Sequence, residues 1–455
     1  MTHDRTDGGT TIAQHFPAIG QRRSVAICLV SAVFATSTAA LATGTVPARA
    51  REVARRATST YHLAPGVKLT TIRRFSVPLE IRVLTVSQGH GSVLDLFTPA
   101  PSYPGYARPS AMGANGGGIA TVNGDFAARD GRPKHLSIVD GEMWTSGIQD
   151  GPAFGVTSDG SRAYVGNPDI VMQAKRGTHA WNIARWNAGG PKKSSITGFS
   201  QRGGGSERPP GDPSPSTSDA RFCAVRLVPT GGFTWTGPGQ AGITRPYTVD
   251  AQPEPCPKTP ISMGTESGAV ALAARNGRTG GDRIRSLRPG DPMRLTWVVK
   301  GWPGVVDVIG GKPMLLRDRR NVAPGYHPGA SYFFGYNPRT AIGISKGCVD
   351  TDTTTICRTF IVTVDGRQKM WSKGMRLPAV AGELKDLGAA WAMNLDGGGG
   401  TVMWVSTRAP AYCEHAIDAG GCLVSRPSDA SGERSSVVAL GVRPAPDSGE
   451  PLAPR

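Results

Sequence analysis

The residues best suited to chemistry lie in one short segment, where an apolar stretch ends in a carboxylate and four consecutive glycines. Glycine loses more conformational entropy on folding than other residues do. Consecutive glycines are therefore expected where the backbone must bend sharply or approach another group closely. Successive N–H groups in such a turn can bind an anion, and a neighbouring carboxylate can act as an acid or base. The alternative is a glycine-rich hairpin with Asp396 capping a turn. The candidate residues are Asn394, Asp396, Gly397, Gly398, Gly399 and Thr401.

A second carboxylate follows another short apolar stretch, in the sequence Asn123-Gly124-Asp125. Asp125 would stand at the end of a strand, where a side chain can reach a substrate. Asn-Gly is also an ordinary turn signal, so a plain hairpin is the competing interpretation. We predict Asp125 as a second catalytic carboxylate, with Asn123 and Gly124 as substrate-binding residues.

Two arginines are candidates for holding phosphate, because the planar guanidinium offers a fork of N–H donors. Arg339 and Thr340 stand at the entrance to an apolar strand, and Arg434 lies in a polar turn near the C-terminal strand. The competing interpretation of each arginine is a solvated surface residue. We predict a catalytic role for Arg339 and substrate binding by Thr340 and Arg434.

A serine-hydrolase motif is also present, since Gly343, Ser345 and Gly347 match the pattern G-x-S-x-G. That motif requires a strand, a tight turn and a helix. Here Cys348 and a threonine-rich stretch follow it, and His415 is the only later histidine. The sequence therefore argues against a serine nucleophile.

Short alternating apolar segments separated by Gly, Asp and Asn predict the strands that position these residues. One helix is predicted, with Pro378 near its start, apolar residues at helical spacing and Gly388 at its end. The fold class expected is α+β, with mixed strand-rich sheets, many hairpins and few helices. Strands are expected at 79–86, 119–122, 137–139, 153–156, 163–165, 223–228, 293–299, 359–364, 389–395, 401–405 and 437–442.

The composition divides the chain into four parts. Residues 1–50 form an export segment, residues 51–64 a polar linker, and residues 65–442 one domain. Within that domain, residues 189–218 are rich in Gly, Pro and Ser with few apolar residues, which predicts a disordered insertion. The proline-rich residues 443–455 predict a disordered tail.

The chain is strongly basic, with a formal net charge of +17 over 455 residues. Such a charge implies an anionic partner or surrounding. The basic residues are scattered, and no zinc-finger spacing, aromatic RNA-binding motif or Lys/Arg-rich helix accompanies them, so no nucleic-acid partner is expected. A phosphate-rich cell envelope fits the charge equally well.

The first 50 residues have the order of an export signal. Arg22 and Arg23 precede an apolar run over 25–42, and Ala48 to Ala50 offer a small-residue cleavage site. An uncleaved anchor of about 18 residues is the alternative and would be the only membrane contact. Either route predicts a secreted or cell-envelope location for the folded part.

Cysteine usage agrees with export. Cys28 lies within the signal, and six other cysteines remain. An even number of cysteines in an exported chain predicts disulfides, and no CxxC or HxxxH spacing supports a metal site, so no metal or other cofactor is expected. Two pairs are close in sequence and the third follows by elimination. The expected disulfides are Cys348–Cys357, Cys413–Cys422 and Cys223–Cys256.

In order and spacing, the motifs of this chain resemble the phosphodiester glycosidase family. The resemblance rests on segments 122–126, 308–315, 337–343, 364–367, 374–377, 394–399 and 427–429 together with Arg434. It spans residues 65–442, almost the whole exported chain. Two positions depart from the family pattern: Gly400 replaces the usual serine, and Ala127 replaces an aromatic residue after Phe126.

The resemblance implies hydrolysis of the bond between a sugar and a phosphate in a sugar-1-phosphodiester, with a phosphorylated glycan or glycopolymer as substrate. The leaving phosphate ester needs cationic or N–H partners, and the anomeric carbon needs a carboxylate. Arg339, Arg434 and the glycine turn suit the first task, and Asp396 and Asp125 suit the second. A non-catalytic envelope module that binds anionic glycopolymer remains the alternative.

Overall fold

A computed structural model describes residues 56–99, 104–203, 222–236, 241–251, 256, 266–349, 355–406, 413, 415–416 and 420–445. The predicted export segment, residues 1–50, lies outside the described residues. Among the helices that the structure describes, none is long and apolar enough to cross a membrane.

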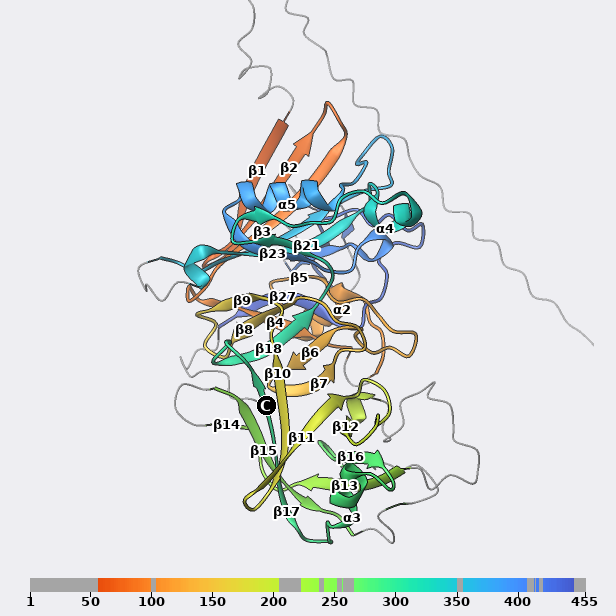
Figure 1. Cartoon of the computed structure of the whole chain (residues 1–455). Helices are drawn as coiled ribbons and strands as arrows, with labels where there is room; N and C mark the ends of the chain where they lie inside the picture. The colour runs from red at the N-terminus through yellow and green to blue at the C-terminus, as the bar shows by residue number, and fades with distance from the viewer. Residues whose placement is uncertain are drawn as a thin grey trace, which may run out of the picture. The chain divides into compact units, whose positions relative to one another are not determined.

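An eight-stranded antiparallel sheet, here sheet I, carries two of the three predicted motifs. The helix α5 (Leu377–Asp386) packs on it through Leu377, Val380 and Leu384, beside the buried Ile81 of the sheet. Figure 1 shows α5 lying along these strands. In spatial order, the strands are β1 (Arg56–Ala64), β2 (Val67–Arg74), β3 (Leu79–Ser87), β22 (Arg358–Val364), β21 (Arg339–Ser345), β23 (Ala389–Asn394), β19 (Met314–Arg317) and β20 (Arg320–Asn321).

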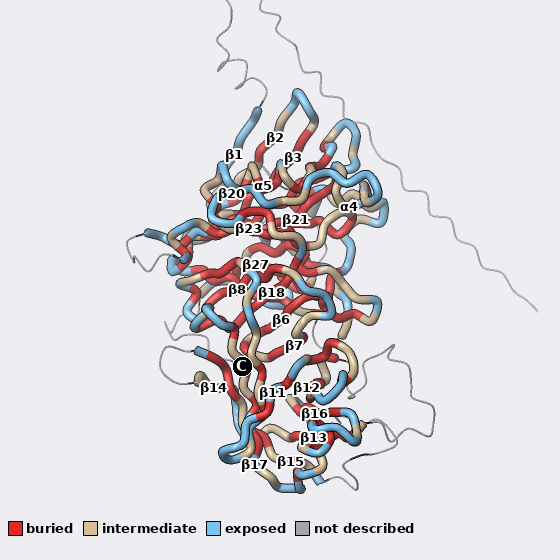
Figure 2. Tube along the Cα trace, viewed as in Figure 1, coloured by how far each residue is buried: buried red, intermediate tan, exposed pale blue. Residues whose placement is uncertain are grey.

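Two smaller antiparallel sheets pack together with sheet I. Sheet II comprises β25 (His415–Ala416), β26 (Cys422–Leu423), β24 (Met403–Val405), β5 (Ala120–Asn123), β27 (Ala439–Pro444) and β4 (Ser92–Phe97). Sheet III comprises β7 (Glu142–Ser146), β6 (Leu136–Val139), β18 (Val305–Gly310), β8 (Ala153–Thr157) and β9 (Ala163–Gly166). One apolar core joins all three sheets and includes Ile342, Val122 and Phe154. Figure 2 shows this buried interior.

The chain between sheet III strands β9 and β18 forms a closed barrel of seven strands, because β13 pairs with both β16 and β15. The barrel core, with Trp181, Leu227 and Trp297, continues into sheet III at Ile138 and Val308. Its ring is β13 (Phe222–Pro229), β16 (Val270–Arg275), β12 (Ile196–Ser200), β11 (His179–Trp186), β10 (Ile170–Arg176), β17 (Pro292–Val299) and β15 (Ile243–Val249), with β14 (Thr234–Trp235) added beside β15.

The α+β class predicted from the sequence is wrong, because the chain is mainly β. The longest described helix, α5, has 10 residues, and the others are too short to cover a sheet. In this protein most strands are covered by other strands, so the core forms by packing sheet on sheet. The remaining described helices are α2 (Pro109–Asn115), α3 (Thr279–Arg285) and α4 (Ser331–Phe334), with single 3₁₀ turns η1 (Gln201–Gly203), η2 (Pro328–Ala330), η3 (Lys346–Cys348) and η4 (Gly398–Gly400).

Three boundaries differ from the predicted ones. Residues 56–64, predicted as linker, form β1, which pairs with β2 along its length. Residues 443–444, predicted as tail, end β27. The predicted insertion contains β12, whose five residues are all buried in the barrel wall. The prediction failed because most residues around this short strand are Gly, Pro or Ser. Ile196 and Phe199 nevertheless give the strand enough apolar surface to be buried in the barrel. Residues 204–218 of the same stretch lie outside the described residues.

The predicted disulfides are confirmed. The structure contains Cys223–Cys256, Cys348–Cys357 and Cys413–Cys422. The first attaches residue 256 to barrel strand β13, and the second closes the segment between β21 and β22. Chain entropy in the unfolded state makes each such bond stabilising, by about 2–4 kcal/mol as a typical value.

Candidate active site

Three sequence motifs meet where the chain passes from sheet I to sheet II. Strand β23 ends at Asn394, the glycine turn follows, and β24 continues in the other sheet. The N–H of Asp396 donates to the carbonyl oxygen of Gly124 at 3.0 Å, and the N–H of Gly398 donates to that of Pro338 at 3.0 Å. The segments around residues 124, 338 and 396 are thus bonded directly to one another, although they are distant in sequence.

Asn123 is the polar centre of this junction. Its Nδ2 donates to the carbonyl oxygen of Asp396 at 2.7 Å. Its Oδ1 accepts hydrogen bonds from Thr340 Oγ1 at 2.6 Å and from the N–H of Val402 at 3.2 Å. Asn123 and Thr340 are both buried. They hold the three motifs in register, and neither side chain faces solvent.

Asp396 is half-buried, and its Oδ1 accepts the N–H of Gly397 at 2.9 Å. Burial raises the pKa of Asp396 to about 6, and the negative charge of Asp125 adds to this effect. The Gly397 hydrogen bond and the positive charges of Arg434 and Lys134 oppose it. A carboxyl group with this pKa is ionised at neutral pH and ready to accept a proton.

Asp125 lies near Asp396 but is fully engaged by the chain. Its carboxylate accepts the N–H of Phe126 and the N–H of His135, both at 2.7 Å. His135 Nδ1 lies 2.6 Å from Asp125 Oδ1, and an ionised carboxylate can only accept, so Nδ1 donates. Burial raises the pKa of Asp125, and the hydrogen bond from His135 opposes that shift. Asp125 therefore fixes the turn whose Gly124 carbonyl holds Asp396.

The glycine turn has already used most of its N–H groups. Those of Gly397 and Gly398 bond to Asp396 and Pro338. Those of Gly400 and Thr401 bond to the carbonyl oxygens of Gly397 and Gly398, each at 3.2 Å. The turn thus has little capacity left to bind an anion through its backbone. Its glycines serve mainly close approach, because a Cβ on Gly397 would lie 2.9 Å from the carbonyl oxygen of Pro338.

The structure places the side chain of Arg339 away from a substrate role. Arg339 is buried, and its guanidinium donates to the carbonyl oxygens of Met375 at 3.0 Å, Phe333 at 2.6 Å and Gly335 at 2.8 Å. Burial and the charge of Arg367 lower the pKa of Arg339 to about 10. A guanidinium bound to backbone carbonyls holds a loop in place. The backbone of Arg339 therefore lies at the site, but its charge does not face a substrate.

Three other cations lie near the glycine turn or near Asp396. Arg367 is exposed, and a Cβ on Gly398 would lie 3.1 Å from its Nη2. Arg434 is exposed and paired with Asp429 at 2.5 Å, and both side chains pack against Gly399. Lys134 acts electrostatically on Asp396. Arg434 and Lys134 thus place positive charge near Asp396, and Arg367 places it beside Gly398.

Arg367 also has an unusual backbone. Its φ of 59° lies in the left-handed region, which a long side chain rarely adopts. The loop is held by Asp365, which accepts Trp371 Nε1 at 2.8 Å and the N–H of Arg426 at 3.1 Å. Arg367 Nη2 donates to Asn337 Oδ1 at 2.9 Å. Such a fixed geometry directs the guanidinium toward the glycine turn.

The other two predicted binding residues are buried. Asn394 Nδ2 donates to the carbonyl oxygens of Lys312, at 2.8 Å, and of Leu395. Thr401 is 2% exposed, and its Oγ1 has no hydrogen-bond partner among the described residues. Asn394 therefore supports the strand end beneath Asp396.

Sequence reasoning missed His135 and Arg367. Arg367 was visible in the motif Val364-Asp365-Gly366-Arg367, but nothing local distinguished it from a solvated arginine. His135 precedes strand β6, and its partner Asp125 lies ten residues earlier across a turn. The alternation of polar and apolar residues does not reveal such a pair.

Comparisons with known proteins agree with the resemblance seen in the sequence. Residues 242–443 match the family model of phosphodiester glycosidase. This range includes Asp396, Arg367 and Arg434 but not Asp125 or His135. No curated protein sequence matches the chain significantly.

Two solved structures are similar in fold, each with 17% sequence identity, a TM-score of 0.58 and 86% of this chain covered. One is a hypothetical protein from Synechocystis, of which the match spans 64%; the other, a protein of Burkholderia pseudomallei K96243 described as exported, is matched over 96%. The catalytic domain of zebrafish N-acetylglucosamine-1-phosphodiester alpha-N-acetylglucosaminidase aligns at 14% identity over 86% of this chain and 89% of that domain. Its TM-score of 0.40 is too low to support an inference.

Proposed function

From the match of residues 242–443 to the phosphodiester glycosidase family, we propose that this protein is an exported hydrolase that separates a sugar from a phosphate. The substrate class is a sugar-1-phosphodiester within an envelope or extracellular glycopolymer. The observation that carries the proposal is Asp396, a half-buried carboxylate with a pKa raised to about 6 and with the positive charges of Arg434 and Lys134 nearby.

Asp396 supplies the negative charge at the anomeric carbon. Hydrolysis breaks the bond between that carbon and the phosphate oxygen, and the oxygen of water takes its place. A carboxylate here can take the proton of the attacking water or stabilise the oxocarbenium-like centre. The hydrogen bonds from Asn123 and to Gly124 fix the backbone of Asp396, so the carboxylate is oriented before the substrate binds.

The leaving phosphate needs cations more than it needs a strong general acid, because a phosphate ester anion already leaves readily. Arg367 has no carboxylate partner among the described residues, so its charge is available to the substrate. Arg434 offers a second guanidinium, partly neutralised by Asp429. Arg367 is therefore the main phosphate anchor in this proposal, and Lys134 adds positive charge near Asp396.

Three observations support a place outside the cytoplasm. The structure has three disulfides, which persist in oxidising compartments. The net charge of +17 suits an envelope rich in phosphate. The N-terminal 50 residues read as an export signal.

A binding module for anionic glycopolymer is the second candidate, because the cationic surface around residues 134, 367 and 434 would serve it equally well. The raised pKa of Asp396 favours the hydrolase. Simple binding of a polyanion gains nothing from a carboxylate held between cations, since that charge repels the ligand.

Turnover of defined substrates tests the proposal. The purified protein is incubated with a panel of sugar-1-phosphate esters that carry a chromogenic alcohol on the phosphate, and release of free sugar is measured by chromatography. The matched control is Asp396→Asn, in which the amide oxygen can still accept the N–H of Gly397. We expect turnover by the natural protein and a loss of at least about a thousandfold in the variant, as for other essential catalytic groups.

Binding of these esters without sugar release by either protein would favour the binding module. Equal turnover by the two proteins would place the chemistry away from Asp396.

A further inference from the structure

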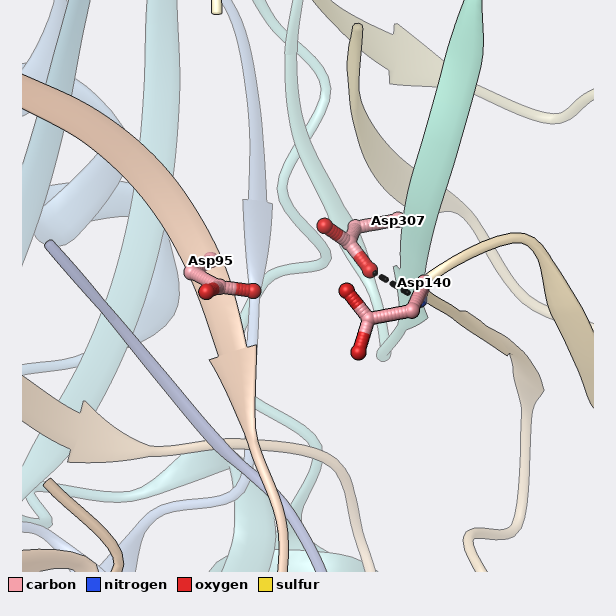
Figure 3. Close-up of side chains that lie close together, drawn as sticks. All are labelled: Asp95, Asp140 and Asp307. Carbon is pink, nitrogen blue, oxygen red and sulfur yellow. Dashed lines mark hydrogen bonds between the residues drawn. The ribbon is translucent and has the colours of Figure 1, made fainter. Parts of the chain in front are cut away.

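Three aspartates that take no part in the site above form a separate cluster between sheets II and III. Asp95 lies on β4, Asp140 in the turn between β6 and β7, and Asp307 on β18. One carboxylate oxygen of each lies within 4.8 Å of those of the other two. Figure 3 shows the three side chains converging from these different elements.

The cluster carries more negative charge than its surroundings balance. Among the residues that the structure describes, Arg443 is the cation that forms an ion pair with it, through Asp95. Three carboxylates and one guanidinium leave a net charge of about −2, in a region where Asp307 is 2% exposed. An ionised cluster would therefore be strongly unfavourable without a further positive charge.

A second observation points to a ligand. Asp307 Oδ1 accepts the N–H of Asp140 at 2.8 Å, but the buried Oδ2 has no hydrogen-bond partner among the described residues. In Figure 3 this free oxygen points away from the Asp140 N–H and toward the side where Asp95 lies. Buried carboxylate oxygens are almost always paired, so an unpaired one directed into an acidic cluster needs a partner.

We propose that Asp95, Asp140 and Asp307 bind a calcium ion that links sheet II to sheet III. All three ligands are oxygens, which hard divalent cations prefer. Oxygens bound to Ca²⁺ at about 2.3–2.6 Å can lie nearly 5 Å apart, whereas Mg²⁺ at about 2.0–2.1 Å requires a tighter cluster. Three carboxylate oxygens that lie within 4.8 Å of one another can therefore share a calcium ion.

Water can complete the coordination. A cavity of about 260 Å³ borders Asp95, Asp140 and Arg443, and a larger cavity of about 500 Å³ also borders Asp140. Calcium takes six to eight oxygen ligands, so three carboxylates and several waters suffice. The two cavities also offer a path by which the ion enters.

The backbone supports the same assignment. Asp140 has a φ of 48°, so its side chain leaves a tight Asp-Gly turn in a fixed direction. Asp307 stands at a register shift in the pairing of β18 with β8. Without an ion, the three carboxylates do not stabilise the fold, because their negative charges repel one another. With a divalent ion bound, they become a cross-link between the two sheets.

Calcium binding to the full chain, first stripped with a chelator, tests the proposal. The matched variants are Asp307→Asn and, as a control, Asp282→Asn, which changes an exposed carboxylate on α3. We expect one bound Ca²⁺ per chain by isothermal titration calorimetry and at least tenfold weaker binding in Asp307→Asn. At calcium about a hundredfold above Kd, the melting temperature should rise by roughly 2–5 °C in the natural protein and in Asp282→Asn only.

A protonated Asp307 is the competing explanation, and the same variants separate it. Asparagine mimics a protonated aspartate, so the competing explanation predicts no calcium dependence in any of the proteins, and that outcome would overturn the proposal. An equal calcium response in Asp307→Asn would overturn it as well. If Asp307→Asn does not fold, Asp140→Asn replaces it, because asparagine tolerates positive φ. It should lose the calcium response in the same way.

Discussion

Asn123 donates a hydrogen bond to the carbonyl oxygen of Asp396 at 2.7 Å, across 273 residues of chain. Its other side-chain atom accepts from Thr340 and from the N–H of Val402. One buried amide thus ties together the ends of β5, β23 and β21. The position of the proposed catalytic carboxylate depends on this amide.

Replacing that amide should be strongly destabilising. Asn123→Ala leaves several buried polar groups unpaired, and we expect a loss of about 2–4 kcal/mol in the free energy of unfolding, measured by urea denaturation. The control is Asn182→Ala, which removes an exposed amide on barrel strand β11 and should change stability by less than about 0.5 kcal/mol. Equal effects of the two changes would show that Asn123 does not organise the junction.

The pH dependence of activity should follow Asp396. Its pKa is raised to about 6, so the carboxyl is protonated below that pH and ionised above it. If the ionised form acts, kcat/KM should fall about tenfold per unit as the pH drops below 6 and be level above about 7. Steady-state rates between pH 4 and 9 measure this limb.

The raised pKa of Asp396 also affects stability, and here the protonated form is the favourable one. The folded state holds the proton of Asp396 more tightly than the unfolded chain, so the raised pKa favours folding at acidic pH. Above pH 6 that benefit is gone and the ionised group is unfavourable. Asp396→Asn should therefore keep or raise the melting temperature at pH 7.5. A lowered value, with exposed Asp150→Asn unchanged, would contradict this prediction.

Gly400 offers a way to shift that pKa. A Cβ at this position would lie 3.3 Å from Asp396 Oδ2, and the position does not require positive φ. In Gly400→Ser the hydroxyl can donate to the carboxylate and stabilise its ionised form. The acidic limb of the pH profile should then move down by about one unit.

Gly400→Ala is the matched control, because it adds the same Cβ without a donor. Alanine should leave the limb in place or move it upward through added burial. If serine and alanine move it equally, the hydroxyl has no contact with Asp396.

Substitutions of Arg339 and Arg367 should have different effects, the first on stability and the second on substrate binding. Arg339→Lys loses most of the hydrogen bonds to three backbone carbonyls, so unfolding should become easier by about 2–4 kcal/mol. Arg367→Asn keeps a residue that tolerates positive φ and removes an exposed charge. It should raise KM for the phosphodiester at least about tenfold with stability nearly unchanged.

Calorimetric unfolding and steady-state kinetics of both variants measure this difference. If Arg339→Lys alone raised KM, the substrate role first predicted from the sequence would be restored.

Local sequence patterns specified several strands, the long helix and the covalent frame. The alternation over 79–86 gave β3, the proline and glycine around 378–388 gave the limits of α5, and cysteine spacing gave all three disulfides. These features depend on residues close in sequence or on a small number of possible pairings. Local patterns therefore suffice to specify them.

The directions of the side chains and their contacts, in contrast, depend on how the sheets pack. The Asn-Pro-Arg-Thr motif predicted an arginine at a strand entrance, but the carbonyls that bind Arg339 come from residues 333, 335 and 375. The closure of the barrel by β13 and β15 and the cluster of Asp95, Asp140 and Asp307 likewise join distant segments, and the pair of His135 and Asp125 forms across a turn. The physical reason is that hydrogen bonds and charge interactions act over a few ångströms of space. The sequence shows which polar and charged side chains are present. The packing of the sheets determines which of them come close enough to form hydrogen bonds or ion pairs.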